Sequence, residues 1–444
     1  MDRRDFLKLG AAGAAAGLLG WPRPLRADTA GYRALVCVFL YGGNDAFNMI
    51  VPASAAEYAA YAASRQNLAL APDVLLPINP LTADGARYGL HPSMGRLQAL
   101  FEAGRAAVIA NVGPLVQPTT RDEARARAVP LPPQLFSHID QQEQWQTLRG
   151  TGTLVTGWAG RVADQLAPLL PAQRLPINVS ITGTVPLSSG DRTSAYVVGD
   201  QGVVGYAAID AAAPGAAARR QAMGALLADA APTPYGRALQ RLRQRAFELA
   251  DITQAALAQE APLATTFPAT PLGRQLAMVA RLIAARGPLA MQRQVFIVGA
   301  GGFDTHDDQL ALQPGLLGAL ADALAAFDAA TVELGVDASV TTFTMSDFGR
   351  TLTSNGDGTD HGWGAHQLVI GGAVRGRDLY GTMPRLEIDG PDDLDAGRIV
   401  PTLGVQPYAA TLLKWFGLDA AAIDAVIPDV GRFARRDLGF MLPG

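Results

Sequence analysis

The sequence predicts an α/β fold in which helices cover both faces of a mostly parallel sheet. Residues 34–40 form a continuous apolar run, which is typical of a strand buried on both faces of such a sheet. Further strand-like runs at 107–112, 294–298 and 340–345 are separated by helical patterns. Glycine or aspartate follows within two residues of each run. Polar side chains are therefore expected at the carboxyl edge of the sheet, where open α/β folds bind their ligands.

The composition indicates a compact globular protein with many loops. Of the 444 residues, 49% are hydrophobic and 17% are charged, and there are 48 glycines and 30 prolines. A chain of this length buries enough surface to fold without disulfides, and Cys37 is its only cysteine. The net charge of -4 provides no basic surface, so we exclude nucleic acid as a partner.

The N-terminus resembles a twin-arginine export signal. Arg3 and Arg4 precede a weakly hydrophobic run, 9–20, and a cleavage region that ends near Ala27. We expect a signal peptide at 1–27, the twin-arginine export machinery as a partner, and a periplasmic or otherwise exported mature protein. An amphipathic N-terminal helix is the alternative. The apolar run is shorter than the ~20 residues of a membrane-spanning helix, and we expect no membrane span in the mature chain.

The remaining chain, 28–444, is expected to form a single α/β domain with insertions at about 175–260. At 211–234 the composition shifts to alanine with arginine, which indicates a surface helix or an insertion. No phosphate loop or dinucleotide fingerprint occurs in the sequence. The expected scaffold helices are 92–103, 156–166, 235–259, 271–285 and 309–334.

The first strand leads into a glycine pair followed by Asn44 and Asp45. This order places Asp45 at the sheet edge, where its carboxylate suits a metal ion. Asn44 is expected to contact substrate. A role for Asp45 as a helix N-cap or turn residue is the alternative.

A helix is expected to begin near Ser137. Ser137 and Asp140 have the spacing of a capping box. A helix N-terminus also favours an activated hydroxyl, because its free N–H groups and dipole point at that spot. Cap and nucleophile therefore both remain open for Ser137. The adjacent His138 is expected to contact substrate.

Asp304 and His306 follow the strand at 294–298. In an extended chain they project to the same side, because side chains alternate with a period of two. A carboxylate and an imidazole on one side suit a divalent ion. Asp307 and Asp308 are interpreted as first-turn acids of the next helix.

The stretch 340–372 contains the densest group of candidate site residues. A loop between two strand-like runs, 340–345 and 368–370, is expected to present metal ligands. Arg350 is placed to bind an anion bidentately, with a surface ion pair as the alternative. The expected ligands are Asp347, Asp360, His361 and His366.

All five histidines lie at predicted element boundaries rather than inside long helices. His91 is also compatible with a turn or helix-start role. Together with the acids at strand ends, the histidines predict one or two divalent ions, of zinc, calcium, magnesium or manganese, which polarise a phosphoryl or sulfuryl oxygen. The five are His91, His138, His306, His361 and His366.

The order of motifs resembles a known family. FLYGGNDAFNMIVP, FSHIDQQEQWQ, TGWAGRVAD, GGFDTHDDQ and SDFGRTLTSNGDGTDHGWGAHQ are together similar to the exported bacterial family catalogued as domain of unknown function 1501. The similarity spans nearly the whole chain. That family resembles a distant branch of the alkaline phosphatase and sulfatase superfamily, which implies a three-layer α/β/α sandwich with a metal site and a hydroxyl nucleophile.

The resemblance also implies roles for individual residues. Phe348 stands where the superfamily has the histidine of an Asp-His pair, which removes one ligand. The roles carried over are Asp45 as the first metal-binding acid, Ser137 near the nucleophile, Asp304 with His306 as the middle pair, Asp347 as the next acid, and His361 or His366 as the closing histidine.

We therefore expect an exported, metal-dependent hydrolase of phosphate or sulfate esters. The alternative is a non-catalytic periplasmic protein of the same fold that binds a polysaccharide or a cell-envelope partner. Phe348 and the open role of Ser137 motivate this alternative.

Overall fold

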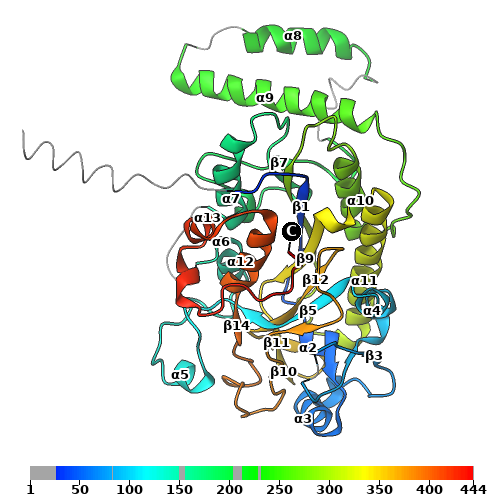
Figure 1. Ribbon diagram of the computed structural model, residues 1–444, viewed down its shortest axis with the longest axis vertical. Helices are drawn as coiled ribbons and strands as arrows, with labels where there is room; N and C mark the ends of the chain where they lie inside the picture. The colour runs from blue at the N-terminus through cyan, green and yellow to red at the C-terminus, as the bar shows by residue number, and fades with distance from the viewer. Residues whose placement is uncertain (1–26, 83, 150–155, 204–212, 229–231, 444) are drawn as a thin grey trace, which may run out of the picture.

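The computed structural model describes residues 27–82, 84–149, 156–203, 213–228 and 232–443. Within them, a nine-stranded sheet forms the centre of the protein (Figure 1). β1 (Arg33–Leu40) pairs in parallel with β8 (Arg293–Ala300) on one side and with β9 (Val340–Ser346) on the other. The order across the sheet is β13, β5, β12, β9, β1, β8, β6, β7, with β14 also paired to β5.

The sheet is mostly parallel, as predicted. Of its nine strands, β12 (Ala365–Ile370) runs antiparallel to both of its neighbours, β9 and β5 (Ala106–Gly113). The other pairings are parallel. The remaining strands are β6 (Asn178–Ser180), β7 (Tyr196–Val197), β13 (Leu379–Tyr380) and β14 (Leu403–Gly404).

Helices cover both faces of the sheet, because alternate residues of its strands face two separate cores. In β1, Leu35, Cys37 and Phe39 belong to one core, whereas Val36 and Val38 belong to the other. The predicted α/β/α layering is confirmed. The first face is covered by α6 (His138–Thr147), α7 (Trp158–Leu166), α12 (Val405–Phe416) and α13 (Ala420–Val426), and the second by α4 (Gly95–Glu102), α10 (Pro271–Ala284) and α11 (Gln309–Glu333).

Helix α11 is long and apolar enough, by length and composition, to cross a membrane. No membrane span is expected in the mature chain, so the apolar composition of this helix requires another explanation. In the structure Leu317, Leu320 and Leu324 of this helix are buried in the core of the second face. The apolar character of α11 is thus explained by its place in the helical layer.

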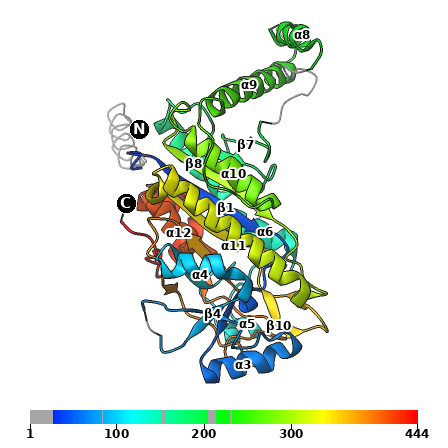
Figure 2. The same ribbon diagram turned by 90° about the vertical axis from the view of Figure 1, so that its right-hand side faces the viewer.

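Smaller elements extend the sandwich at two ends (Figures 1 and 2). Helices α8 (Ala216–Ala228) and α9 (Pro234–Leu257) lie beyond the β7 end of the sheet, within the range predicted as an insertion. The predicted signal peptide falls almost entirely outside the described residues. At the opposite end lie α2 (Ala46–Met49), α3 (Ala55–Arg65), α5 (Arg121–Arg125) and a three-stranded sheet of β2 (Ile50–Pro52), β4 (Tyr88–Leu90) and β3 (Leu76–Ile78).

The predicted loop between β9 and β12 contains a further hairpin. β10 (Arg350–Ser354) and β11 (Thr359–His361) pair antiparallel, with Arg350 opposite His361. The expectation of an irregular loop here was wrong. The hairpin fixes the position of His361 by main-chain pairing.

Candidate metal centre

The carboxyl ends of three central strands meet at one edge of the sheet. Leu40 at the end of β1 is in register with Ala300 of β8 and Ser346 of β9. Because the strands are parallel, the segments that follow them start side by side. The first residue of α6, His138, and the last residue of β11, His361, meet the segment that follows β8.

Three imidazoles surround the Asp304 carboxylate. The Nε2 atoms of His306 and His361 lie 3.0 Å and 3.3 Å from its Oδ1. The Nε2 atom of His138 lies 3.4 Å from its Oδ2. Ligand atoms of His138, Asp304 and His361 all lie within 4.8 Å of one another. This group can hold a metal ion between imidazole nitrogens and a carboxylate oxygen.

Each of the three imidazoles is oriented by an acceptor at its Nδ1 atom. Carbonyl and carboxylate oxygens only accept hydrogen bonds, so each Nδ1 is the donor, and in a neutral ring the Nε2 atom that faces Asp304 is then an acceptor. Metal-binding histidines characteristically have such partners. The pairs are His361 with the Phe136 carbonyl at 2.7 Å, His138 with Asp347 Oδ2 at 2.7 Å, and His306 with Asp360 Oδ1 at 3.2 Å.

Asp347 and Asp360, both predicted as ligands, lie in this outer layer. Asp347 is fully buried, and its Oδ2 also accepts hydrogen bonds from the Gly42 amide and from Gln142. Asp360 is exposed and accepts a hydrogen bond from Asn355. In this arrangement the two acids orient imidazoles and do not belong to the group of converging ligand atoms.

Arg350 holds Asp304 in its charged form. The guanidinium is completely buried and donates to Asp304 Oδ1 at 2.6 Å. Partial burial raises the pKa of Asp304, but the hydrogen bond and charge of Arg350, followed by His306 and His138, outweigh it and lower this pKa below its usual value. Arg350 was predicted to contact substrate or to form a surface ion pair. Its buried contact with Asp304 instead makes it a support of the candidate ligand.

His361 is kept neutral by its surroundings. Burial lowers its pKa, and the nearby charges of His138 and Arg350 lower it further. The hydrogen bond to the Phe136 carbonyl acts in the opposite direction but does not reverse the shift. A neutral imidazole is the form that binds a metal.

Two glycines allow the sheet edge to pack this closely. Gly42 and Gly43 have φ values of +113° and +85°, which side chains rarely adopt. A Cβ atom on Gly42 would lie 2.4 Å from the Asp304 amide nitrogen, and one on Gly43 would lie 2.4 Å from the Phe348 ring. Phe348, at the position where the family resemblance calls for a histidine, packs with ring centroids 4.8 Å from His138 and 4.6 Å from His361.

The structure does not bring Asp45 into the histidine group. Asp45 is the N-cap of α2, and its side chain accepts from the amides of Phe47 and Asn48. It also pairs with the fully buried Arg65 and accepts from Gln309 at 2.5 Å. These contacts agree with the alternative interpretation of Asp45 as a helix N-cap.

Asn44 is likewise fully buried. Its amide nitrogen donates to Ser346 Oγ at 2.8 Å, and its side-chain nitrogen lies 3.5 Å from Met49 Sδ. These contacts turn the side chain of Asn44 into the protein rather than toward an open site.

His366 also lies outside the group. Its Nδ1 accepts from the Asn111 amide at 3.1 Å, and its ring makes an edge contact with Phe47. Complete burial lowers the pKa of His366 to about 3. His91 similarly serves as a cap, since its Nδ1 accepts from the Ser93 amide. Of the two candidates for a closing histidine, the structure brings His361 to Asp304.

Ser137 is the N-cap residue of α6, but its side chain makes no capping bond. Its hydroxyl donates to the carboxylate of Asp140 instead. The predicted capping box is therefore wrong in its geometry, because the serine oxygen does not accept from the helix. Ser137 immediately precedes His138 and is half-buried.

Several contributions to this site carried no signal in the sequence. The Phe136 carbonyl is a backbone group, and Gln142 was not singled out among the residues of its helix. His138 was expected to contact substrate, whereas the structure groups its Nε2 with the candidate ligands. Its position as the first residue of a helix beside the sheet edge was the available signal.

Two family models match the sequence. A family model described as "Protein of unknown function (DUF1501)" matches residues 32–426. The chain belongs to the DUF1501 family. A second model, for the twin-arginine translocation pathway signal sequence, matches residues 1–20. This member of the DUF1501 family is therefore exported across the cytoplasmic membrane.

Solved structures show distant similarity to this DUF1501 protein. The crystal structure of Ps i-CgsB in complex with k-i-k-neocarrahexaose has 10% identity and a TM-score of 0.34, covering 89% of this chain and 72% of that one. The zinc complex of the C-terminal periplasmic domain of EcEptC from Escherichia coli has 9% identity and a TM-score of 0.30, covering 79% and 77%. No curated protein matches the chain.

Proposed function

We propose that the protein is an exported, metal-dependent hydrolase of phosphate or sulfate esters. The observation that carries the proposal is the convergence of three imidazoles, each with a hydrogen-bond acceptor at Nδ1, on the Asp304 carboxylate. Neutral imidazoles in this arrangement direct their Nε2 lone pairs toward Asp304, and a bound cation would be coordinated by these nitrogens and the carboxylate together.

The donor set favours zinc among the candidate ions. Imidazole nitrogen suits zinc, whereas calcium and magnesium prefer shells made of oxygen. A zinc ion held by His138, His361 and Asp304, with His306 as a further ligand, would polarise an ester oxygen and lower the pKa of a bound water. Arg350 would keep Asp304 ionised and fixed.

Ser137 is the proposed nucleophile. It immediately precedes His138 in the chain and is half-buried. The carboxylate of Asp140 accepts the hydroxyl proton and can take it up when the oxygen attacks an ester. A metal-bound water is the alternative nucleophile, and a substitution of Ser137 distinguishes the two.

A distant relationship to the alkaline phosphatase and sulfatase superfamily is part of this proposal. It is supported by the three-layer fold and by the place of the candidate site at the carboxyl edge of the sheet. The candidate site departs from a bimetal pattern, because Asp45 is paired with Arg65 and Phe348 replaces a histidine. We therefore propose a single ion.

The pairing of Asp45 with Arg65 and the presence of Phe348 in place of a histidine also favour a second candidate function. A protein of this fold that binds a polysaccharide or a cell-envelope partner needs no second ion and no nucleophile. In this case the metal would stabilise the binding surface.

Turnover measurements on phosphate and sulfate esters test the first proposal. The mature protein is loaded with zinc and compared with Asp304→Asn, Ser137→Ala and a control, His91→Asn, in which asparagine can still cap the helix. We expect the control to keep turnover and Asp304→Asn to lose it. Full turnover in Asp304→Asn contradicts the proposal. Stoichiometric zinc without turnover on any ester favours the second candidate. Full turnover in Ser137→Ala identifies water as the nucleophile.

A further inference from the structure

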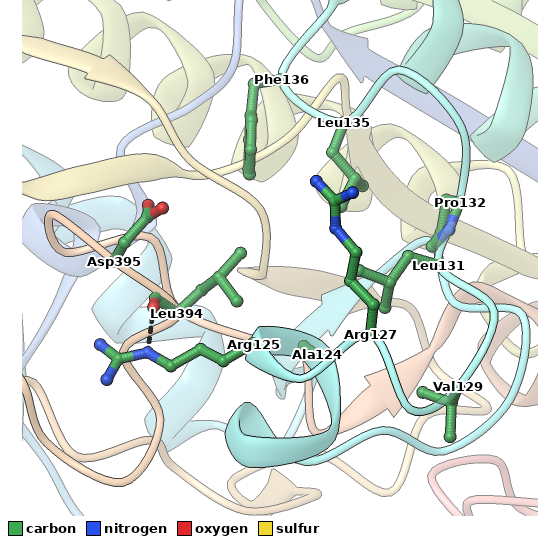
Figure 3. Close-up of a pocket in the computed structure, with 10 residues that line it drawn as sticks. All are labelled: Ala124, Arg125, Arg127, Val129, Leu131, Pro132, Leu135, Phe136, Leu394 and Asp395. Carbon is green, nitrogen blue, oxygen red and sulfur yellow. Dashed lines mark hydrogen bonds between the residues drawn. The ribbon is translucent and has the colours of Figure 1, made fainter.

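A cavity of about 670 Å³ lies beside the segment that leads into α6 (Figure 3). Its walls come from the segment 124–136, which precedes α6, and from residues 394 and 395. Most of its lining is apolar, and two arginines also face it. The residues that matter here are Arg125, Arg127, Leu131, Leu135, Phe136 and Leu394.

Phe136 connects this cavity to the candidate metal centre. Its side chain lines the cavity, while its carbonyl accepts from His361 Nδ1 at 2.7 Å. The guanidinium of Arg398 lies 4.7 Å from the centroid of the Phe136 ring and donates to the His361 carbonyl at 3.2 Å. Arg398 also pairs with Asp395 on the cavity wall at 2.6 Å. Phe136 and Arg398 therefore each connect the cavity wall to His361, a candidate metal ligand.

The two arginines of the cavity differ in their partners. Arg125 donates to the Leu394 carbonyl and lies 3.6 Å from Asp389. For the guanidinium of Arg127, the described part of the chain provides no hydrogen-bond or ion-pair partner. Figure 3 shows this guanidinium pointing along the cavity toward Leu135 and Phe136. Arg127 is exposed, so water solvates its guanidinium until a ligand binds. A positive charge beside apolar side chains is complementary to a ligand with both characters.

The backbone of this wall is held in an uncommon conformation. Arg127, Gln134 and Phe136 have φ values of 50°, 50° and 73°, although none is a glycine. Such residues are energetically unfavourable and persist where the surrounding structure fixes them, often at ligand sites. The shape of the cavity wall is therefore specified by the fold.

We propose that this cavity binds an aromatic anion, with its ring against Leu131, Leu135 and Phe136 and its negative group on Arg127. This inference rests on the proposed function, because it assigns to the same site the non-reacting part of an ester substrate. A ring fits the apolar wall, and a carboxylate or similar group satisfies the free guanidinium. The substrate class is then an aryl ester that carries a second negative charge.

Three small probes test the contribution of the ring and the contribution of the negative group separately. Binding to the zinc-loaded mature protein is measured by calorimetry for 2-naphthoate, for the neutral 2-naphthalenemethanol and for acetate. We expect 2-naphthoate to bind at least about tenfold more tightly than either of the others, since a charge-assisted hydrogen bond contributes roughly 1.5–3 kcal/mol. Equal binding of 2-naphthoate and the neutral alcohol overturns the role of the anion, and equal binding of acetate overturns the role of the ring.

Two arginine variants assign the binding to this cavity. Arg127→Gln is expected to lose about tenfold in affinity for 2-naphthoate and to keep its affinity for the neutral alcohol. Arg96→Gln, on the exposed surface of α4, is the matched control and should behave as wild type. Unchanged 2-naphthoate affinity in Arg127→Gln overturns the proposal.

Proximity to the metal is measured separately from hydrolysis. Cobalt accepts the same nitrogen ligands as zinc and is paramagnetic. The ring protons of bound 2-naphthoate should therefore shift in the NMR spectrum of the cobalt-loaded protein but not in that of the zinc-loaded protein. Binding without such a shift overturns the link between cavity and metal. Binding with the shift but without ester turnover supports this inference while the proposed hydrolase function fails.

Discussion

The Nε2 atoms of His306 and His361 lie 2.9 Å apart, although each ring has an acceptor for a proton at Nδ1. Two imidazole lone pairs at this distance repel each other unless a proton or a cation lies between them. Asp304 adjoins both rings, and a cation shared by the two Nε2 atoms, as proposed for zinc, would remove this repulsion.

Zinc should stabilise the folded protein. At a free zinc concentration 100 times the dissociation constant, the free energy of unfolding should rise by about 2.7 kcal/mol. Thermal unfolding with zinc and after treatment with a chelator measures the effect. His361→Ala should lose most of it, whereas His91→Asn should retain it. An equal zinc response in wild type and His361→Ala would show that the ion binds elsewhere.

Asp45 should matter for stability rather than for metal binding. Asp45→Ala leaves the charge of Arg65 buried without its partner, which should lower the free energy of unfolding by about 3–5 kcal/mol. Urea denaturation measures the loss, and Asp45→Ala combined with Arg65→Met should recover part of it. Bound zinc should remain stoichiometric in the folded double variant. If Asp45→Ala instead loses zinc at undiminished stability, Asp45 is a ligand, as the family resemblance implies.

Asp360→Asn should weaken zinc binding about tenfold without affecting the fold. The carboxylate orients His306 and makes its other nitrogen a better donor, and loss of such a partner typically lowers metal affinity 10–100-fold. Because Asp360 is exposed, the circular dichroism spectrum should not change. Competition with a zinc chelator provides the affinity. Asp307→Asn, at a nearby exposed acid, is the control. A loss of zinc affinity of similar size in Asp307→Asn would show that the effect of Asp360→Asn comes from the general surface charge.

Gly42→Ala should disrupt the site through backbone geometry. Its Cβ atom would overlap Asp304, and alanine disfavours the φ value of +113°. We expect lower stability together with weaker zinc binding. Gly31 also has a positive φ, +66°, but its Cβ would meet nothing within 4 Å. Gly31→Ala should therefore lose stability alone. Equal zinc affinities in the two variants would show that the close approach to Asp304 does not matter.

His366 should make the protein sensitive to moderately acid pH. Its pKa is about 3 in the folded protein because of burial, compared with the ordinary histidine value of 6.5. Above pH 6.5 the neutral, buried His366 leaves the free energy of unfolding unaffected by pH. As the pH falls from 6.5 toward 3, the unfolded chain binds a proton at His366 before the folded protein does, and the free energy of unfolding decreases.

The measurement for His366 is the free energy of unfolding of zinc-free protein at pH 6 and pH 5. Between these values wild type should lose about 1 kcal/mol more than His366→Gln. Parallel pH dependences of the two proteins would contradict the assignment.

The sequence predicted the scaffold well because buried parallel strands have a strong local signature. The run 34–40 coincides with β1 to within one residue, and 271–285 with α10. Residues 350–361 were expected to be a loop, since serine, asparagine, glycine and aspartate there resemble any polar turn. Their pairing into a hairpin depends on contacts with distant segments.

The sequence located the candidate site but did not distinguish ligands from their supports. Asp304 and Asp360 are both exposed aspartates in polar segments, yet one lies at the centre of the histidines and the other behind His306. Asp45 has the ideal position after a strand, but Arg65, twenty residues later, occupies its carboxylate. Such pairings are properties of the folded chain and have no local pattern.

The pairing of β1 with strands that lie far along the chain also has a consequence for biosynthesis. Its two neighbours in the sheet, β8 and β9, follow about 260 and 300 residues later in the chain. The central strand thus has no partner until about two-thirds of the protein has left the ribosome, which favours slow folding and temporary exposure of apolar surface. An export route that accepts folded cargo lets this step finish in the cytoplasm. The identity of the bound ion would then be decided by cytoplasmic metal supply rather than by that of the periplasm.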